Sequence, residues 1–250
     1  MLTHRRKFPP MTIGASHHCR ATRRLVFIQS LLGLGAHLFL ALPYLRRTHG
    51  LDRLRPEQRY LFVVNHVSLL DTILLGALCW RSKCYPILVL GDRNVWQASG
   101  IKTLLSSRIG FLLERGKLNP NRIRELEVFG RAAKEFHLVV FPEGTRGDGL
   151  QVGPCQAGIY FIAQEARVPL VPVFIENMQL VSTKTGRFHP LAGLRKVEVH
   201  FGEPVAPENY LRMPREEFTE FVRRSIAAAQ RTKGHSALAD SLALRNPQRP

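Results

Sequence analysis

Apolar and polar positions divide the chain into two kinds of segment. Short runs dominated by Val, Ile, Leu and Phe predict buried strands at residues 60–64, 86–90, 137–140, 168–173 and 196–201. The last run alternates apolar and polar residues, which predicts a half-exposed strand. Proline cannot donate to a strand ladder, so Pro169 and Pro172 place their run at a strand entry, a sheet edge or a bulge.

Longer segments carry apolar residues at helical spacing. The clearest lies at 119–136, with Ile123, Leu126, Phe129, Ala133 and Phe136 on one face. Similar patterns predict helices at 68–80, 155–167 and 214–230. Because helices and strands alternate along the chain, the predicted fold class is α/β, a layered mixed or mostly parallel sheet covered by helices.

The N-terminal region is apolar without interruption by charge. Leu25 to Leu45 contains no Asp, Glu, Lys or Arg, and as a helix it would be about 30 Å long, enough to cross a bilayer core. A helix lying in the membrane interface is the alternative, and a spanning or re-entrant helix is preferred. We therefore expect a disordered basic arm at 1–24, a membrane-associated helix at 25–48, a folded domain at 49–230 and a mobile tail at 231–250.

The chain is strongly basic, with a formal net charge of +17. Such a surface favours anionic partners, namely membrane lipids, the phosphates of coenzyme A, or nucleic acid. Nucleic acid is the least favoured, because the chain has no zinc-finger spacing, no RNA-recognition octamer and no basic-region heptads. The four cysteines form no Cys-x-x-Cys pair, which indicates a reducing compartment and no structural metal.

His66 and Asp71 are the first candidate catalytic residues. His66 lies two positions after the predicted strand 60–64, and Asp71 follows five residues later. An imidazole can take a proton from an attacking alcohol, and a carboxylate on its other nitrogen fixes the tautomer. The same stretch also matches a capping box, with Ser68 as N-cap and Asp71 reaching back to a backbone N–H. For Ser68 and Asp71 taken alone, the capping box is the commoner explanation.

Three further blocks carry residues suited to a phosphate-bearing substrate. In Phe141-Pro142-Glu143-Gly144-Thr145-Arg146, Gly144 lets backbone N–H groups approach a ligand and Arg146 offers a planar fork for phosphate. The run that starts at Gly110 ends at Arg115, and Pro172 belongs to the last block. Each block alone is weak evidence for a site.

In order and spacing, the four blocks resemble the glycerophospholipid acyltransferase family, typified by 1-acyl-sn-glycerol-3-phosphate acyltransferase. The resemblance covers roughly residues 50 to 205. The matching positions are Asn65, His66 and Asp71, then Arg115, then Glu143, Gly144 and Arg146, and finally Pro172. The sequence departs from the family pattern at Gln156, where a lysine is frequent, and this loses one cation that could meet an anionic substrate.

The resemblance implies a direct transfer of an acyl group, without cofactor or metal. The donor would be a thioester of coenzyme A or acyl carrier protein, and the acceptor a lysophospholipid, foremost lysophosphatidate. His66 would act as base and Asp71 as its orienter, while Arg115 and Arg146 would hold the phosphate. Since such donors are cytosolic, the resemblance implies an inner or cytoplasmic membrane with the catalytic domain facing the cytoplasm.

Several roles stay open in the sequence. Glu143 and Thr145 are expected in the acceptor site, and Asn65, Ser68 and Pro172 as supporting residues. Backbone N–H groups near His66 or Gly144 are candidates to stabilise the oxyanion. Glycerol 3-phosphate or another lysolipid, such as a lyso-ornithine lipid, would use the same chemistry. A covalent mechanism through Ser68 is the enzymatic alternative, although no Gly-x-Ser-x-Gly elbow is present.

Overall fold

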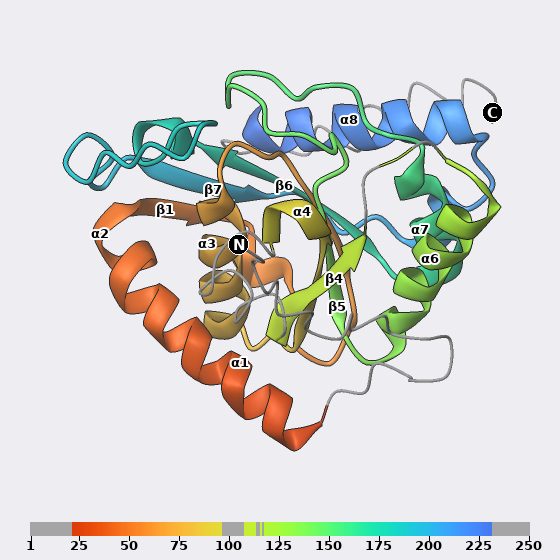
Figure 1. Ribbon diagram of the computed structural model, residues 1–250, viewed down its shortest axis with the longest axis horizontal. Helices are drawn as coiled ribbons and strands as arrows, with labels where there is room; N and C mark the ends of the chain where they lie inside the picture. Colours follow the sequence, from red (N-terminus) through yellow and green to blue (C-terminus); the bar gives the residue numbers. More distant parts are fainter. Residues whose placement is uncertain (1–21, 97–107, 114–115, 117, 232–250) are drawn as a thin grey trace, which may run out of the picture.

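The described residues form a seven-stranded sheet between two layers of helices (Figure 1). The computed structural model describes residues 22–96, 108–113, 116 and 118–231. The strands are β1 (Leu45–His49), β2 (Leu61–Val64), β3 (Ile87–Asp92), β4 (Gly110–Leu113), β5 (His137–Val140), β6 (Leu170–Glu176) and β7 (Val197–Phe201). Their order is β1-β7-β6-β2-β5-β3-β4, and every neighbouring pair is parallel except β6 with β7. The expected layered, mostly parallel α/β fold is confirmed.

Two hydrophobic clusters, one on each face of the sheet, hold the layers together. On one face lie α1 (Arg23–Ala36) and α3 (Leu69–Arg81), and on the other α6 (Pro120–Arg131), α7 (Gly158–Ala166) and α8 (Arg215–Arg231). The short α4 (Arg93–Trp96) follows β3, and 3₁₀ turns lie at Leu51–Arg53, Ala132–Lys134, Met178–Leu180 and Pro207–Asn209. Strands β2 and β5 are buried along their whole length because both of their faces are covered.

The predicted helices and strands are present with boundaries shifted by a few residues, but β7 differs from the prediction. Its polar positions are not half-exposed: Glu198 and His200 are 8% and 1% exposed. They face a polar group made with neighbouring strands, since His49 on β1 contacts Glu198 at 3.2 Å and Glu176 on β6 contacts His200 at 3.1 Å. The alternation of apolar and polar residues in β7 therefore reflects a buried face with hydrogen-bonded polar side chains, and not a face exposed to solvent.

The N-terminal helical segment runs from Arg23 to Tyr44 through α1, a π-helical turn (His37–Ala41) and α2 (Leu42–Tyr44). The helix expected at 25–48 is therefore shorter, because residues 45–49 form the edge strand β1. Its inner face packs on α3, where Gly33 allows close contact with Trp80 and the Trp80 indole donates to Ser30 at 3.1 Å. The buried Gln29 amide bonds the backbone N–H and C=O of Ile87 at the start of β3.

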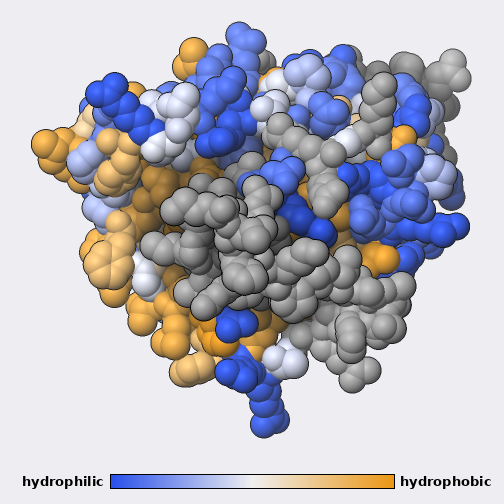
Figure 2. Space-filling view, in the orientation of Figure 1, coloured by the Kyte–Doolittle hydropathy of each residue, from blue (hydrophilic) through white to orange (hydrophobic). Residues whose placement is uncertain are grey.

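The outer face of the same segment is apolar and exposed. Figure 2 shows hydrophobic residues gathered over α1 and α2, along the left side of the molecule. Their side chains recur at helical spacing and are 40% to 82% exposed: Phe27, Leu31, Leu34, Leu38, Phe39 and Leu42. One face of the segment Arg23–Tyr44 thus packs on the protein, and the other face has no partner among the described residues.

Candidate active site

His66 and Asp71 meet where β2 passes into α3. The Nδ1 atom of His66 lies 3.0 Å from Oδ2 of Asp71, and the carboxylate is fully buried while the imidazole is 15% exposed. With Nδ1 held by a carboxylate, Nε2 is the atom left to accept a proton from a substrate hydroxyl. The expected pairing of these two residues is therefore present.

The capping box and the His–Asp pair share one carboxylate oxygen. Oδ2 of Asp71 also accepts the backbone N–H of Val67 at 2.6 Å and of Ser68 at 2.8 Å, and the Ser68 hydroxyl accepts the N–H of Leu70 at 3.2 Å. The capping box and the His66–Asp71 contact are thus both present, and the catalytic role of the pair stays a prediction. Helix capping fixes the carboxylate, and the fixed carboxylate fixes the imidazole.

The loop after β5 forms hydrogen bonds with the backbone of His66. Oε1 of Glu143 accepts the His66 N–H at 3.0 Å, and the N–H of Gly147 donates to the His66 carbonyl at 2.7 Å. The ring of Phe141 stacks on the imidazole at 4.2 Å between centroids. The second oxygen of Glu143 accepts the N–H of Gly153 at 3.0 Å, and burial raises the pKa of Glu143. Glu143 thus joins this loop to His66, and it also lines the cavity in front of His66.

A cavity of about 1010 Å³ opens in front of His66. Gly144, Thr145 and Arg146 line it, and Gly144 has a φ of +66°, a left-handed conformation that suits glycine. The rest of the lining is largely aliphatic, from Leu69, Val89, Leu90, Leu113, Leu118, Leu126, Ile159 and Ile162. A base at one wall, cations and an aliphatic lining suit an amphipathic, negatively charged substrate.

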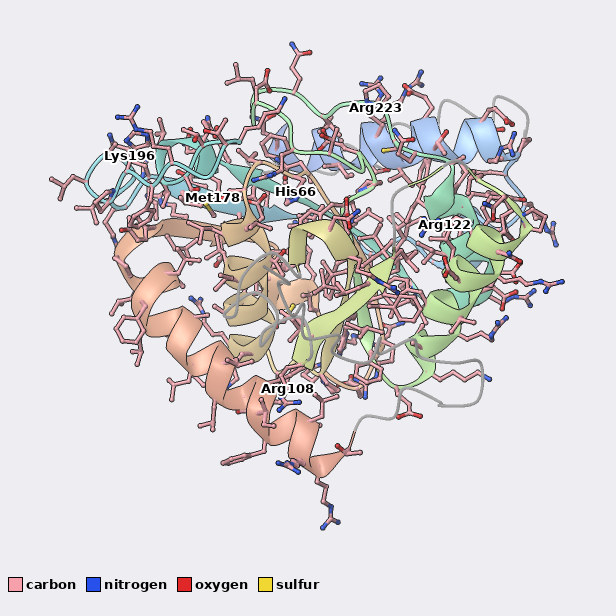
Figure 3. All side chains as sticks on the ribbon, in the orientation of Figure 1. His66, Arg108, Arg122, Met178, Lys196 and Arg223 are labelled. Atoms are coloured by element: carbon pink, nitrogen blue, oxygen red, sulfur yellow. The ribbon has the colours of Figure 1, made fainter. Side chains whose placement is uncertain are left out.

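Two basic side chains that line this cavity were not predicted from the sequence. Arg122 on α6 and Lys184 after β6 both line it, so that with Arg146 three basic side chains surround the space. Figure 3 shows His66 and Arg122 on well-separated elements, α6 lying across the sheet from the start of α3. No motif marks Arg122 or Lys184, because only the folding of three distant segments brings them to one cavity.

The supporting residues turn out to be structural. The Asn65 side chain pairs with the backbone of Ile175 in both directions, at 3.0 and 2.7 Å, and so ties the end of β2 to β6. Pro172 lies buried within β6, an interior strand, and does not line the cavity. Three steps on β6, from Leu170 to Val173, face four on the partner segment, from Val205 to Phe201, so the pairing beside Pro172 is irregular and the extra residue belongs to the partner segment. Arg115 lies outside the described residues.

The N–H groups expected to stabilise an oxyanion are already engaged. Those of His66, Val67 and Ser68 donate to the carboxylates of Glu143 and Asp71, and that of Gly144 donates to the Phe141 carbonyl at 3.0 Å. These four N–H groups therefore have acceptors within the protein, and their hydrogen bonds hold the loop and the His66–Asp71 pair. The donors to an oxyanion stay a prediction.

One other group of side chains has the composition of a metal site. In the described ranges, ligand atoms of His49, Glu198 and His200 lie within 4.8 Å of one another. A histidine that binds a metal through one nitrogen needs an acceptor for the other, and Nδ1 of His200 is buried without one among the described residues. Glu198 is in addition paired with Arg46 at 3.3 Å. These residues are accounted for as a hydrogen-bonded network at the edge of the sheet.

Comparison with known proteins is consistent with this geometry. The family model described as Acyltransferase matches residues 46–176. The 1-acyl-sn-glycerol-3-phosphate acyltransferase of Saccharomyces cerevisiae is 26% identical over 190 residues, covering 72% of this chain and 58% of the yeast protein. The lyso-ornithine lipid O-acyltransferase of Pseudomonas aeruginosa is 32% identical over 142 residues, covering 56% of this chain and 50% of that protein.

A solved structure shares the fold. The 1-acyl-sn-glycerophosphate acyltransferase PlsC of Thermotoga maritima superposes with a TM-score of 0.62 at 18% identity, covering 88% of this chain and 86% of that one. The chain spans little more than half the length of the two relatives named above. Since the family model covers more than half of the chain and includes both the His66–Asp71 pair and the Glu143 loop, the protein belongs to the acyltransferase family.

Proposed function

We propose that the protein transfers a fatty acyl group from a thioester to a hydroxyl of a lysophospholipid. The observation that carries the proposal is the His66–Asp71 pair at the wall of an aliphatic, cation-bearing cavity. His66 takes the proton of the attacking hydroxyl and the oxygen adds to the thioester carbonyl. The C–S bond then breaks, and the leaving sulfur takes the proton from the imidazolium and departs as a thiol. Asp71 holds the tautomer and balances the charge of the imidazolium. No covalent enzyme intermediate is needed.

The donor is proposed to be acyl-coenzyme A or acyl carrier protein. Either supplies its own activated carbonyl, so the reaction needs no cofactor. Ser68 is not the nucleophile in this scheme, because its hydroxyl caps α3 through Leu70 and it is 2% exposed.

The acceptor is proposed to be lysophosphatidate, acylated to phosphatidate. Arg122, Arg146 and Lys184 around one cavity favour a phosphate headgroup, and guanidinium groups bind phosphate through two parallel hydrogen bonds. A lyso-ornithine lipid is the second candidate, favoured by the 32% identity to the Pseudomonas enzyme and by Gln156 in the cavity lining, where the family often has lysine.

The protein is proposed to work on a membrane surface, held by the outer face of α1 and α2. A helix that crosses a bilayer would expose its whole circumference to lipid, but here Gln29 and Gly33 commit one face to β3 and α3. The exposed stripe from Phe27 to Leu42 would lie in the interface, parallel to the surface. This replaces the spanning or re-entrant insertion preferred from the sequence.

The first experiment compares detergent-solubilised wild type with His66→Ala. Both are incubated with palmitoyl-coenzyme A and, separately, lysophosphatidate, glycerol 3-phosphate and a lyso-ornithine lipid, and the products are identified by mass spectrometry. Phosphatidate formed by wild type alone would establish both acceptor and base. Arg131→Ala, which removes an exposed side chain of α6 outside the cavity lining, is the control and should keep activity. Full activity of His66→Ala would refute the mechanism.

A second variant locates the phosphate. Arg146→Ala should raise the apparent KM for lysophosphatidate by about ten-fold and leave that for the thioester nearly unchanged, because a charged hydrogen bond is worth about 1.5–3 kcal/mol. A KM increase confined to the thioester would instead place the donor's phosphates at Arg146.

A further inference from the structure

The segment between β6 and β7 presents large apolar side chains to solvent. Within residues 181–196, here called the basic loop, Phe188, Leu191 and Leu194 are 52%, 80% and 43% exposed. Exposed side chains of this size, close together in sequence, are typical of surfaces that meet a partner. None of these three residues lines the cavity.

Hydrogen bonds give the basic loop a defined shape. The N–H of Thr183 donates to the Arg187 carbonyl at 2.9 Å, and the N–H of His189 donates to the Val181 carbonyl at 2.8 Å. Gly193 packs so closely on Val181 that a Cβ there would lie 2.3 Å from a Val181 methyl carbon. The apolar side chains are therefore presented by an ordered hairpin-like segment.

The basic loop is joined to the end of α2. The N–H of Arg195 donates to the Pro43 carbonyl at 3.0 Å, and its guanidinium donates to the Leu42 carbonyl at 3.3 Å. The Tyr44 and Phe188 rings meet edge to face at 6.1 Å. The apolar side chains of the loop thus continue the exposed stripe of α1 and α2. Figure 1 shows the loop between β6 and β7 close to the end of α2.

Charge complements this apolar surface. Residues 177–196 contain Lys184, Arg187, Arg195 and Lys196 and no Asp or Glu. The preceding apolar segment is likewise flanked by Arg23 and Arg46, and residues 1–51 contain no acid. Figure 3 shows Lys196 at the outer edge of the molecule, on the side of α2. Basic side chains around exposed apolar ones are suited to an anionic lipid surface.

A turn of the same loop reaches the candidate active site. Lys184 and Thr185, between Thr183 and Arg187, line the cavity in front of His66, four and three residues before Phe188. One short segment therefore connects a lipid-facing surface to the place where a lysolipid headgroup would be held.

We propose that the basic loop is a second membrane-docking element, which seats the mouth of the cavity on an anionic bilayer so that the lysolipid acceptor enters from the membrane. Leu191 and Leu194 insert among the headgroups, and Arg187 and Lys196 contact lipid phosphates. The proposal rests on the proposed membrane association of α1 and α2 and extends it to a segment that no acyltransferase block includes.

The test measures binding of the full chain to vesicles without turnover. Wild type, Leu191→Glu and Arg187→Gln/Lys196→Gln are sedimented with vesicles of phosphatidylcholine alone or with one third phosphatidylglycerol. Leu150→Glu is the matched control, since Leu150 is 68% exposed but belongs to the loop after β5 and does not line the cavity. Circular dichroism confirms that each variant is folded.

We expect the variants in the basic loop to bind vesicles more weakly and the control variant outside it to bind normally. Leu191→Glu should weaken binding to anionic vesicles by ten-fold or more, because it removes apolar burial and adds a negative charge. The double charge variant should lose about five-fold per side chain on anionic vesicles only, with a smaller salt dependence. Leu150→Glu should bind like wild type. Unchanged binding of Leu191→Glu and of the charge variant would overturn the proposal.

A second readout separates this inference from the proposed reaction. In acyl-transfer assays, Leu191→Glu should lose activity on lysolipid in vesicles but keep it on lysolipid dispersed in detergent. Equal loss in both formats would show that the loop shapes the cavity, and would overturn membrane docking. If wild type transfers no acyl group but its vesicle binding depends on Leu191, the proposed reaction fails and the docking surface stands.

Discussion

Replacing Asp71 by Asn separates the two tasks of this side chain. In the native protein one buried oxygen of Asp71 accepts three hydrogen bonds, from the Val67 and Ser68 backbones and from the His66 imidazole. The first two cap α3, and the third orients the base. Asparagine keeps a carbonyl oxygen for the cap but has no negative charge to set against an imidazolium.

The structure gives the size of both effects. Asp71→Ala would leave two buried backbone N–H groups without an acceptor, at about 1–3 kcal/mol each, a large part of the roughly 5–15 kcal/mol that stabilises a domain. Asp71→Asn keeps an acceptor for both N–H groups but places its amide nitrogen where Oδ1 is buried without a partner among the described residues. It should therefore cost about 1–3 kcal/mol in total, less than Asp71→Ala, and each kcal/mol is equivalent to about 2–4 °C in Tm for a chain of this size. Its kcat should nevertheless fall by about 10²–10⁴-fold, the usual contribution of a positioned base.

The assay pairs thermal unfolding with initial rates of acyl transfer on the same preparations. Asp71→Asn should be folded, more stable than Asp71→Ala and almost inactive, with the KM of both substrates little changed. An activity within three-fold of wild type would refute the orienting role of Asp71. If the fraction of activity lost equals the fraction of protein unfolded, Asp71 acts only as a helix cap.

Three further perturbations test other parts of the argument. Ser68→Ala should lower stability by about 1 kcal/mol through loss of the cap and keep activity in the thioester assay; an inactive, folded variant would revive a covalent serine. Glu143→Gln should lower kcat more than it raises the acceptor KM, because one of its two buried N–H partners loses its acceptor and His66 shifts; a pure KM effect in steady-state kinetics would make Glu143 a substrate ligand. Burial lowers the pKa of His137 to about 3 from its ordinary 6.5, so the folded state resists protonation and stability should fall by about 2 kcal/mol between pH 7 and pH 5. Urea unfolding of His137→Phe should lack that share of the pH dependence, and an unchanged slope would contradict it.

Most strands and helices could be predicted from the sequence because each has its own pattern of apolar residues. The runs at 60–64 and 137–140 are apolar throughout, since both faces of β2 and β5 are covered. The apolar and polar pattern gave a wrong prediction where the burial of a residue depends on side chains from another strand. The polar residues of β7 are buried against Glu176 and His49, and β1 was hidden at the end of an apolar helix.

The sequence by itself determined the acyltransferase blocks and the local pairing of His66 with Asp71, because the two residues are five positions apart at a strand-to-helix turn that the Ser68 capping box fixes. Only the tertiary structure decided what surrounds them. Arg122, Arg146 and Lys184 are distant in sequence and share a cavity only after β5, β6 and α6 have packed. The same holds for the N-terminal segment, since hydropathy alone cannot distinguish a helix that crosses a membrane from one that lies on it. The contacts of Gln29 and Gly33 show which face of the helix packs on the protein, and the proposed interfacial placement is based on them.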